Sequence, residues 1–165
     1  MSAPMQGRPS SHQIGRDLED QVEALLRNWS APYRRGYSIA TSFGSRFTTD
    51  FWLPPVEGRP PVVIEAKNFG VTAVRTADSR GRKAQEALYL LVHVRRHCDQ
   101  TRGARIVLMS GAEKFSTDQV NFLTAELGPD FHVVSIDEPE RLRALLLPDQ
   151  SSGEQEPRHA TLRDA

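Results

Sequence analysis

The stretch Val62–Lys67, with the sequence VVIEAK, is the part of the sequence that most clearly predicts the fold. Three apolar residues lead directly into Glu65, and such a run is typical of a strand buried in the centre of a sheet. Side chains alternate along a strand, so Glu65 and Lys67 point to one face and Ile64 and Ala66 to the other. The stretch therefore predicts a carboxylate and an ammonium that share one site.

A second carboxylate belongs to the preceding predicted strand. Asp50 lies between Phe47 and the apolar residues 51–53, and a Pro-rich turn separates it from Glu65. A hairpin of this length can bring the two carboxylates together. They would repel each other unless a hard cation lay between them, and Mg²⁺ prefers oxygen ligands. The simpler interpretation is that Glu65 and Lys67 form an ion pair on a solvated sheet face.

Hydrophobic periodicity and turn residues divide the rest of the chain into alternating helices and strands. Residues 1–11 and 148–165 are rich in Pro, Ser, Gly and charge, which predicts flexible tails around a single domain at 12–147. The order of elements indicates an α/β fold with a mixed sheet and helices on both faces. The predicted helices are 14–29, 82–98, 116–127 and 137–147, and the predicted strands are 37–43, 46–53, 62–69, 105–110 and 131–136.

Composition excludes several classes of protein. With 21 basic and 21 acidic residues among 165, the chain has no net charge, which argues against a tail-driven or histone-like nucleic-acid binder. The only cysteine, Cys98, cannot form an internal disulfide and is expected to be a small buried residue. No apolar stretch is long enough to span a membrane, so we expect a cytoplasmic protein without a membrane partner.

With Asp50 followed by Glu65-Ala66-Lys67, the chain resembles the PD-(D/E)xK nuclease superfamily, in which Thr49 here replaces the motif proline. The resemblance implies a restriction-endonuclease-like mixed sheet with an α-βββ-α-β core, followed here by an extra C-terminal α-β-α. It also implies a Mg²⁺-dependent DNA endonuclease, with Mn²⁺ as a substitute. Asp50, Glu65 and the Ala66 carbonyl would hold the metal, and Lys67 would position the attacking water.

Two further elements are similar to those of branches of the same superfamily. Gly15-x-x-x-Glu19 matches Holliday-junction-resolvase-like and Mrr-like members, which implies that Glu19 adds a metal ligand. Gln85-x-x-x-Tyr89 matches RecB-like members, which implies that Gln85 assists catalysis and Tyr89 touches DNA. The plain alternatives are an acidic residue that complements the helix dipole at position 19, a surface Gln85, and a Tyr89 packed in the core.

Basic residues near the predicted site are candidates for phosphate contacts. Two other pairs, Arg34-Arg35 and Arg95-Arg96, are more simply read as solubilising charge. The candidates for DNA binding are Arg46, Arg75, Arg80, Arg82 and Lys83.

The leading hypothesis is hydrolysis of DNA phosphodiester bonds in restriction, repair, recombination or defence. The alternative is a non-catalytic accessory subunit with a nuclease-like fold that binds nucleic acid or a protein partner. We expect no separate recognition domain within these 165 residues, so specificity would come from loops, from a protein partner or from the homodimer that the resemblance implies.

Overall fold

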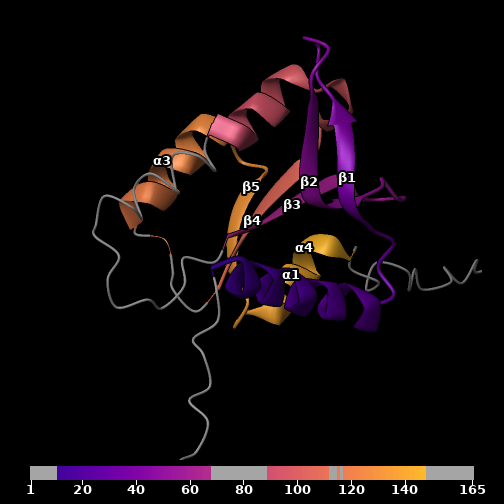
Figure 1. Cartoon of the computed structure of the whole chain (residues 1–165), viewed down its shortest axis with the longest axis vertical. Helices are drawn as coiled ribbons and strands as arrows, with labels where there is room; N and C mark the ends of the chain where they lie inside the picture. The colour runs from indigo at the N-terminus through magenta and orange to yellow at the C-terminus, as the bar shows by residue number, and fades with distance from the viewer. Residues whose placement is uncertain (1–10, 68–88, 112–114, 116, 148–165) are drawn as a thin grey trace, which may run out of the picture.

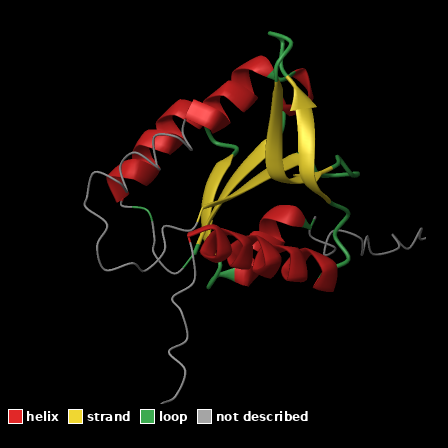
Figure 2. Ribbon diagram, in the orientation of Figure 1, coloured by secondary structure: helices red, strands yellow, loops and turns green. Residues whose placement is uncertain are grey.

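Five strands form one mixed sheet in the order β1-β2-β3-β4-β5. The computed structural model describes residues 11–67, 89–111, 115 and 117–147. Helices cover both faces of the sheet, as Figures 1 and 2 show. The mixed α/β fold predicted from the sequence is thereby confirmed. The strands are β1 (Arg34–Ala40), β2 (Arg46–Leu53), β3 (Val62–Lys67), β4 (Arg105–Ser110) and β5 (Phe131–Ser135).

The sheet combines an antiparallel and a parallel half. β1, β2 and β3 form the predicted antiparallel meander. β4 pairs in parallel with β3 on one side and with β5 on the other, so it is the buried inner strand that its apolar sequence predicts. The register places Glu65 opposite Leu108 and Lys67 opposite Ser110. These two site residues therefore lie on a strand with neighbours on both sides.

The two faces of the sheet have separate hydrophobic cores. Helices α1 (Ser11–Asn28) and α4 (Pro139–Leu146) cover one face, where Leu18, Val22 and Leu142 pack against Ile64 and Val107. The helical residues 89–97 and helix α3 (Thr117–Leu127) cover the other face. A short 3₁₀ helix, η1 (Asp99–Thr101), follows Cys98, which is buried as expected. No helix in the described part of the chain is long and apolar enough to cross a membrane.

Both ends of strand β1 differ from the sequence prediction by three residues. β1 begins at Arg34 rather than at residue 37, because Arg34 and Arg35 pair with Trp52 and Phe51 in spite of the turn-like Gly36 between them and Tyr37. Gly36 has a φ of 60°, a value that glycine adopts without strain. β1 also ends at Ala40, because the following residues form the turn to β2.

Helix α1 begins at Ser11, earlier than predicted. Glu19 consequently lies eight residues into the helix, and the first turn of α1 holds no acidic residue. The interaction of an acidic residue with the helix dipole fades beyond the first turn. The plain alternative for Glu19, a favourable charge at the helix start, is therefore wrong.

The ladder between β2 and β3 stops just before the predicted site. Backbone pairing runs from Leu53 opposite Val62 to Phe51 opposite Ile64. Beyond that point side chains take over: the Thr49 hydroxyl donates to the Ile64 carbonyl at 3.1 Å, and the Ala66 amide donates to Asp50 Oδ2 at 2.7 Å. The end of the ladder thus fixes where the Asp50 carboxylate lies.

Candidate active site

Asp50 and Glu65 meet where the two strands separate. Asp50 is half-buried, and one of its oxygens is held by the Ala66 amide. Burial raises the pKa of Asp50, although the Ala66 hydrogen bond and the charge of Lys67 act in the opposite direction. The negative charge of Asp50 in turn raises the pKa of Glu65. The two predicted carboxylates are therefore close enough for the charge of Asp50 to influence the ionisation of Glu65.

Glu65 and Lys67 are in direct contact, because both side chains leave β3 on the same face. Lys67 Nζ lies 2.6 Å from Glu65 Oε1. The Glu65 side chain is only 3% exposed, whereas that of Lys67 is 32% exposed. A solvated ion pair on a sheet face, the simpler interpretation of this sequence, is thus wrong: the carboxylate is in the interior and the ammonium reaches toward water.

The second oxygen of Glu65 is the most unusual atom of the site. Glu65 Oε2 is buried and has no hydrogen-bond partner. Burial is the main reason that the pKa of Glu65 rises to about 7, followed by the charge of Asp50. Lys67 and a hydrogen bond from the Asp50 backbone amide act in the opposite direction. Burial also acts to lower the pKa of Lys67, but Glu65, Asp50 and Glu19 together outweigh it, and the pKa of Lys67 is raised.

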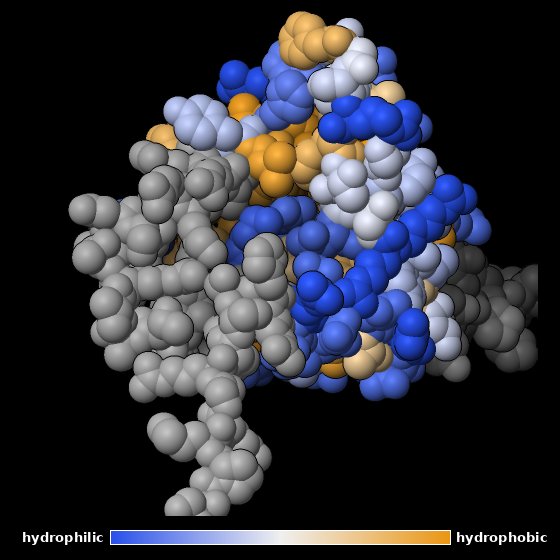
Figure 3. Space-filling view, in the orientation of Figure 1, coloured by the Kyte–Doolittle hydropathy of each residue, from blue (hydrophilic) through white to orange (hydrophobic). Residues whose placement is uncertain are grey.

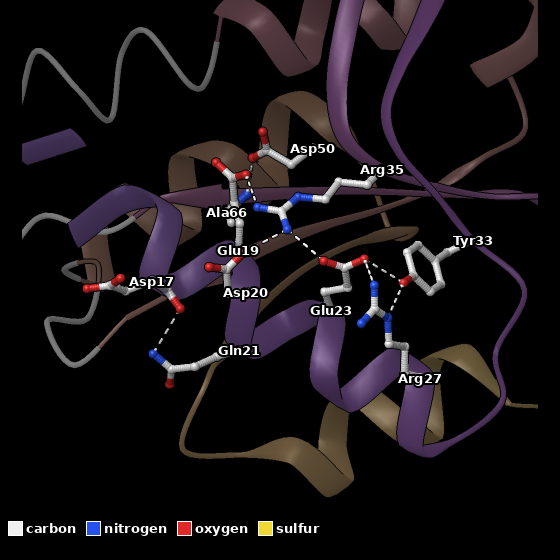
Figure 4. A network of polar contacts seen from close by, with 10 residues as sticks. All are labelled: Asp17, Glu19, Asp20, Gln21, Glu23, Arg27, Tyr33, Arg35, Asp50 and Ala66. Carbon is white, nitrogen blue, oxygen red and sulfur yellow. Dashed lines mark hydrogen bonds and ion pairs between the residues drawn. The ribbon is translucent and has the colours of Figure 1, made fainter. Parts of the chain in front are cut away.

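A network of ion pairs joins α1 to β1 beside Asp50 (Figure 4). The guanidinium of Arg35 lies 2.9 Å from Glu19, 2.7 Å from Asp20 and 2.6 Å from Glu23. Hydrogen bonds to Asp20 and then to Glu19 raise the pKa of Arg35. The interpretation of Arg35 as merely solubilising charge is therefore wrong, because this residue connects two elements. Arg34 instead lies over the ring of Tyr37.

Glu19 faces the site but has a partner of its own. Figure 4 shows its side chain beside Asp50 and Ala66, and its charge raises the pKa of both Asp50 and Lys67. Its Oε2 is paired with Arg35. Across the described ranges, no three His, Cys, Asp or Glu side chains are grouped closely enough to hold a metal ion. The structure brings Asp50, Glu65 and Lys67 together and leaves Glu19 engaged next to them.

The comparisons with known proteins add no relative. No family model and no curated protein matches this chain. Two close carboxylates, one buried oxygen without a partner and an ammonium between protein and solvent are a donor set for a hard divalent cation and an anionic ligand.

The other predicted site residues fall into two groups. Arg46 lies at the start of β2 and donates to the Ser38 hydroxyl at 2.7 Å, so its guanidinium is engaged near the hairpin turn. Tyr89 is 75% exposed, which contradicts the alternative that it packs in the core. Five predicted residues lie outside the described residues: Arg75, Arg80, Arg82, Lys83 and Gln85.

Two residues important to the geometry were missed by the sequence analysis. Thr49 was considered only as a replacement for the motif proline, yet its buried hydroxyl closes the end of the β2–β3 ladder. Arg35 gathers three acidic side chains of α1. The only signal for Arg35 was the spacing of Glu19, Asp20 and Glu23, which places all three toward one side of the helix.

Proposed function

We propose that this chain is a Mg²⁺-dependent DNA endonuclease of the PD-(D/E)xK type. The observation that carries the proposal is the buried Glu65 oxygen without a partner, next to Asp50 and Lys67. A carboxylate in the interior is costly unless it is protonated, paired or bound to a cation. Here one oxygen is paired with Lys67, and the other accepts no hydrogen bond within 3.5 Å, although the Asp50 backbone amide also acts on this carboxyl.

The residues present fit a magnesium ion. Mg²⁺ is commonly held by one or two carboxylates, keeps several waters and takes phosphate oxygens from its substrate. Glu65 Oε2, the Asp50 oxygen not engaged by Ala66 and the Ala66 carbonyl are the ligands we propose. When bound, the ion would polarise a phosphodiester and lower the pKa of a water molecule. A third carboxylate is not needed for this mode of binding.

The protein side chains perform the remaining tasks. Glu65 must be ionised, and its contact with Lys67 favours that form. The half-exposed Lys67 ammonium is placed to orient a water molecule and to offset the negative charge that develops on the phosphate. Arg35 is paired with the neighbouring Glu19, and its charge opposes the rise in the pKa of Asp50 that burial causes. Each role depends on a contact at the end of β2 or β3.

Nicking of a supercoiled plasmid in the presence of Mg²⁺ or Mn²⁺ tests the proposal. We expect Asp50→Asn and Lys67→Met each to reduce the cleavage rate on the order of a hundredfold or more, as expected for groups that act on the transition state. Glu57→Gln is the matched control, because Glu57 is an exposed acid in the β2–β3 turn and its loss should leave the rate unchanged.

Two results would contradict the proposal. Cleavage that persists in Asp50→Asn would assign the activity to another site or to a contaminant. A wild-type chain that binds DNA and Mg²⁺ but cuts nothing would favour the accessory-subunit function instead.

A further inference from the structure

An aromatic side chain is held out of the protein at the turn between β1 and β2. Phe43 is 71% exposed. Figure 3 shows hydrophobic atoms protruding at the top of the molecule, where Figure 1 places the tip of this hairpin. Burial of a Phe side chain stabilises the folded state of a protein. The protein forgoes this contribution at a position where a polar residue would be the usual choice.

The turn that carries Phe43 is well anchored. The Thr41 amide donates to the Ser45 carbonyl at 2.9 Å, and the Gly44 amide donates to the Thr41 carbonyl at 3.1 Å. The Ser42 amide donates to the carbonyl of His97 at 2.7 Å, which ties the turn to the end of the helical residues 89–97. The exposure of Phe43 is therefore a property of a fixed turn and not of a loose loop.

Other rings continue from Phe43 along the helix. The centroid of Phe43 lies 4.8 Å from that of His97 and 6.2 Å from that of His93, and the two imidazoles are 5.0 Å apart. Tyr89, which is exposed, lies four residues before His93 and thus on the same helical side. Phe43, His97, His93 and Tyr89 form what we call the ring row.

The ring row lies over the same face of the sheet as the candidate active site. Val63 packs in one core with Val94, which belongs to the helical residues 89–97. Glu65 and Lys67 follow Val63 on the same side of β3, because they are two and four residues further on. A strand of DNA at Lys67 therefore meets the face of the sheet on which the helix with the ring row packs.

We propose that the ring row is a stacking platform for unpaired nucleobases, so that the substrate of the proposed nuclease contains single-stranded DNA. This inference rests on the proposed function for its occupant. The helical part of the row extends over eight residues, or about 12 Å at 1.5 Å per residue. At about 3.4 Å per nucleotide, it matches three or four bases.

The composition of the row favours bases over a protein partner. Two of its four rings are imidazoles, which carry polar nitrogens. Arg96 on the same helix adds a basic group whose side chain is 62% exposed and lies 3.7 Å from Glu126. A stable protein interface buries roughly 1,200–2,000 Å², far more than four side chains provide. Aromatic rings beside basic groups are the usual means of binding single strands without reading their sequence.

Fluorescence anisotropy with a labelled single-stranded oligonucleotide, in EDTA so that no cleavage occurs, tests the inference. Loss of one base-stacking ring typically weakens binding by roughly 5- to 150-fold. We expect Phe43→Ala to weaken binding within this range and Phe43→Trp to restore it. Phe122→Ala is the matched control, because Phe122 is an exposed ring on α3, outside the ring row, and its loss should change nothing.

An abasic oligonucleotide of the same length separates stacking from charge. Wild type and Phe43→Ala should bind it equally, because it offers phosphates without bases. Three results would overturn the inference: unchanged binding in Phe43→Ala, an equal loss on the abasic strand, or a change of oligomeric state that makes this face an interface between copies. Because binding is measured without a metal, failure of cleavage alone would count against the proposed function and not against the ring row.

Discussion

Glu65 is almost entirely buried, yet only one of its carboxylate oxygens, Oε1, forms an ion pair with Lys67. Its pKa of about 7, against an ordinary value of 4.5, means that the folded protein binds a proton more tightly there than the unfolded chain does. The contribution to stability is thus fully present below about pH 4.5 and is lost as the pH rises through about 7. At neutral pH this site costs the protein stability, which is common where function requires an unusual charge.

We predict that this cost can be measured by removing the charge. A difference of about 2.5 pKa units corresponds to roughly 3 kcal/mol in the free energy of unfolding. Between about pH 5 and about pH 8, the wild type should therefore lose stability relative to Glu65→Gln, by urea denaturation at matched pH. Mg²⁺ should recover part of the loss in the wild type only. Parallel pH profiles for the two proteins would show that Glu65 titrates normally.

The positions of the site side chains could be predicted where they follow from the alternation of side chains along a strand. Glu65 and Lys67 share a face because they are two apart on a strand, and the apolar run before them indicated burial. The partner of Arg35 was not predictable in the same way, since which acidic residues meet β1 depends on how α1 docks. Gln85 and the basic residues that precede it remain predictions.

At the scale of elements, Arg35 links β1 to α1 through three carboxylates. Its side chain is 32% exposed, so the network is partly screened by solvent. We predict that Arg35→Gln lowers the free energy of unfolding by about 1–2 kcal/mol, because it leaves Glu19, Asp20 and Glu23 close together without a cation.

Arg102→Gln provides the control for this prediction. Arg102 pairs with Asp99, and both side chains are largely exposed. Its loss should change the free energy of unfolding by less than about 0.5 kcal/mol. If urea denaturation gave the same small value for both variants, the network would hold no more stability than an ordinary surface pair.

The end of the β2–β3 ladder gives a second prediction at this scale. Thr49→Val removes the hydroxyl that donates to the Ile64 carbonyl in the interior and leaves that acceptor without this partner. We expect a loss of about 1–2 kcal/mol in the free energy of unfolding, together with weaker Mg²⁺ binding because the adjacent Asp50 is less well placed. Thr48→Val, on the exposed side of the same strand, should have little effect on either quantity. Similar losses for the two variants would contradict the assigned role of Thr49.

At the scale of the whole molecule, we predict a homodimer. One candidate active site per chain suffices to cut one DNA strand, and cutting both strands requires a second site. Size-exclusion chromatography with light scattering at micromolar concentration should give twice the chain mass of 18.5 kDa. A monomer would leave nicking or cleavage of single strands as the activity that one chain can perform.

Much of the architecture could be predicted because periodicity and turn residues are local. β2 and β4 were predicted with their observed bounds, and the meander and the inner position of β4 followed from their sequences. The start of β1 could not be predicted from the sequence. The residues Arg34-Arg35-Gly36 have a turn-like composition, and they form a strand only because they pair with β2. Hydrophobic periodicity also cannot predict that side-chain hydrogen bonds replace backbone pairing between β2 and β3 at Asp50.

The hydrogen bond from the Ala66 amide to Asp50 makes a single nucleus a reporter of the pocket. Protonation of the Asp50 carboxylate, or binding of a cation to it, must alter the chemical shift of the Ala66 amide proton and its rate of exchange with deuterium. Nuclear magnetic resonance of this one signal would therefore follow occupancy of the pocket directly.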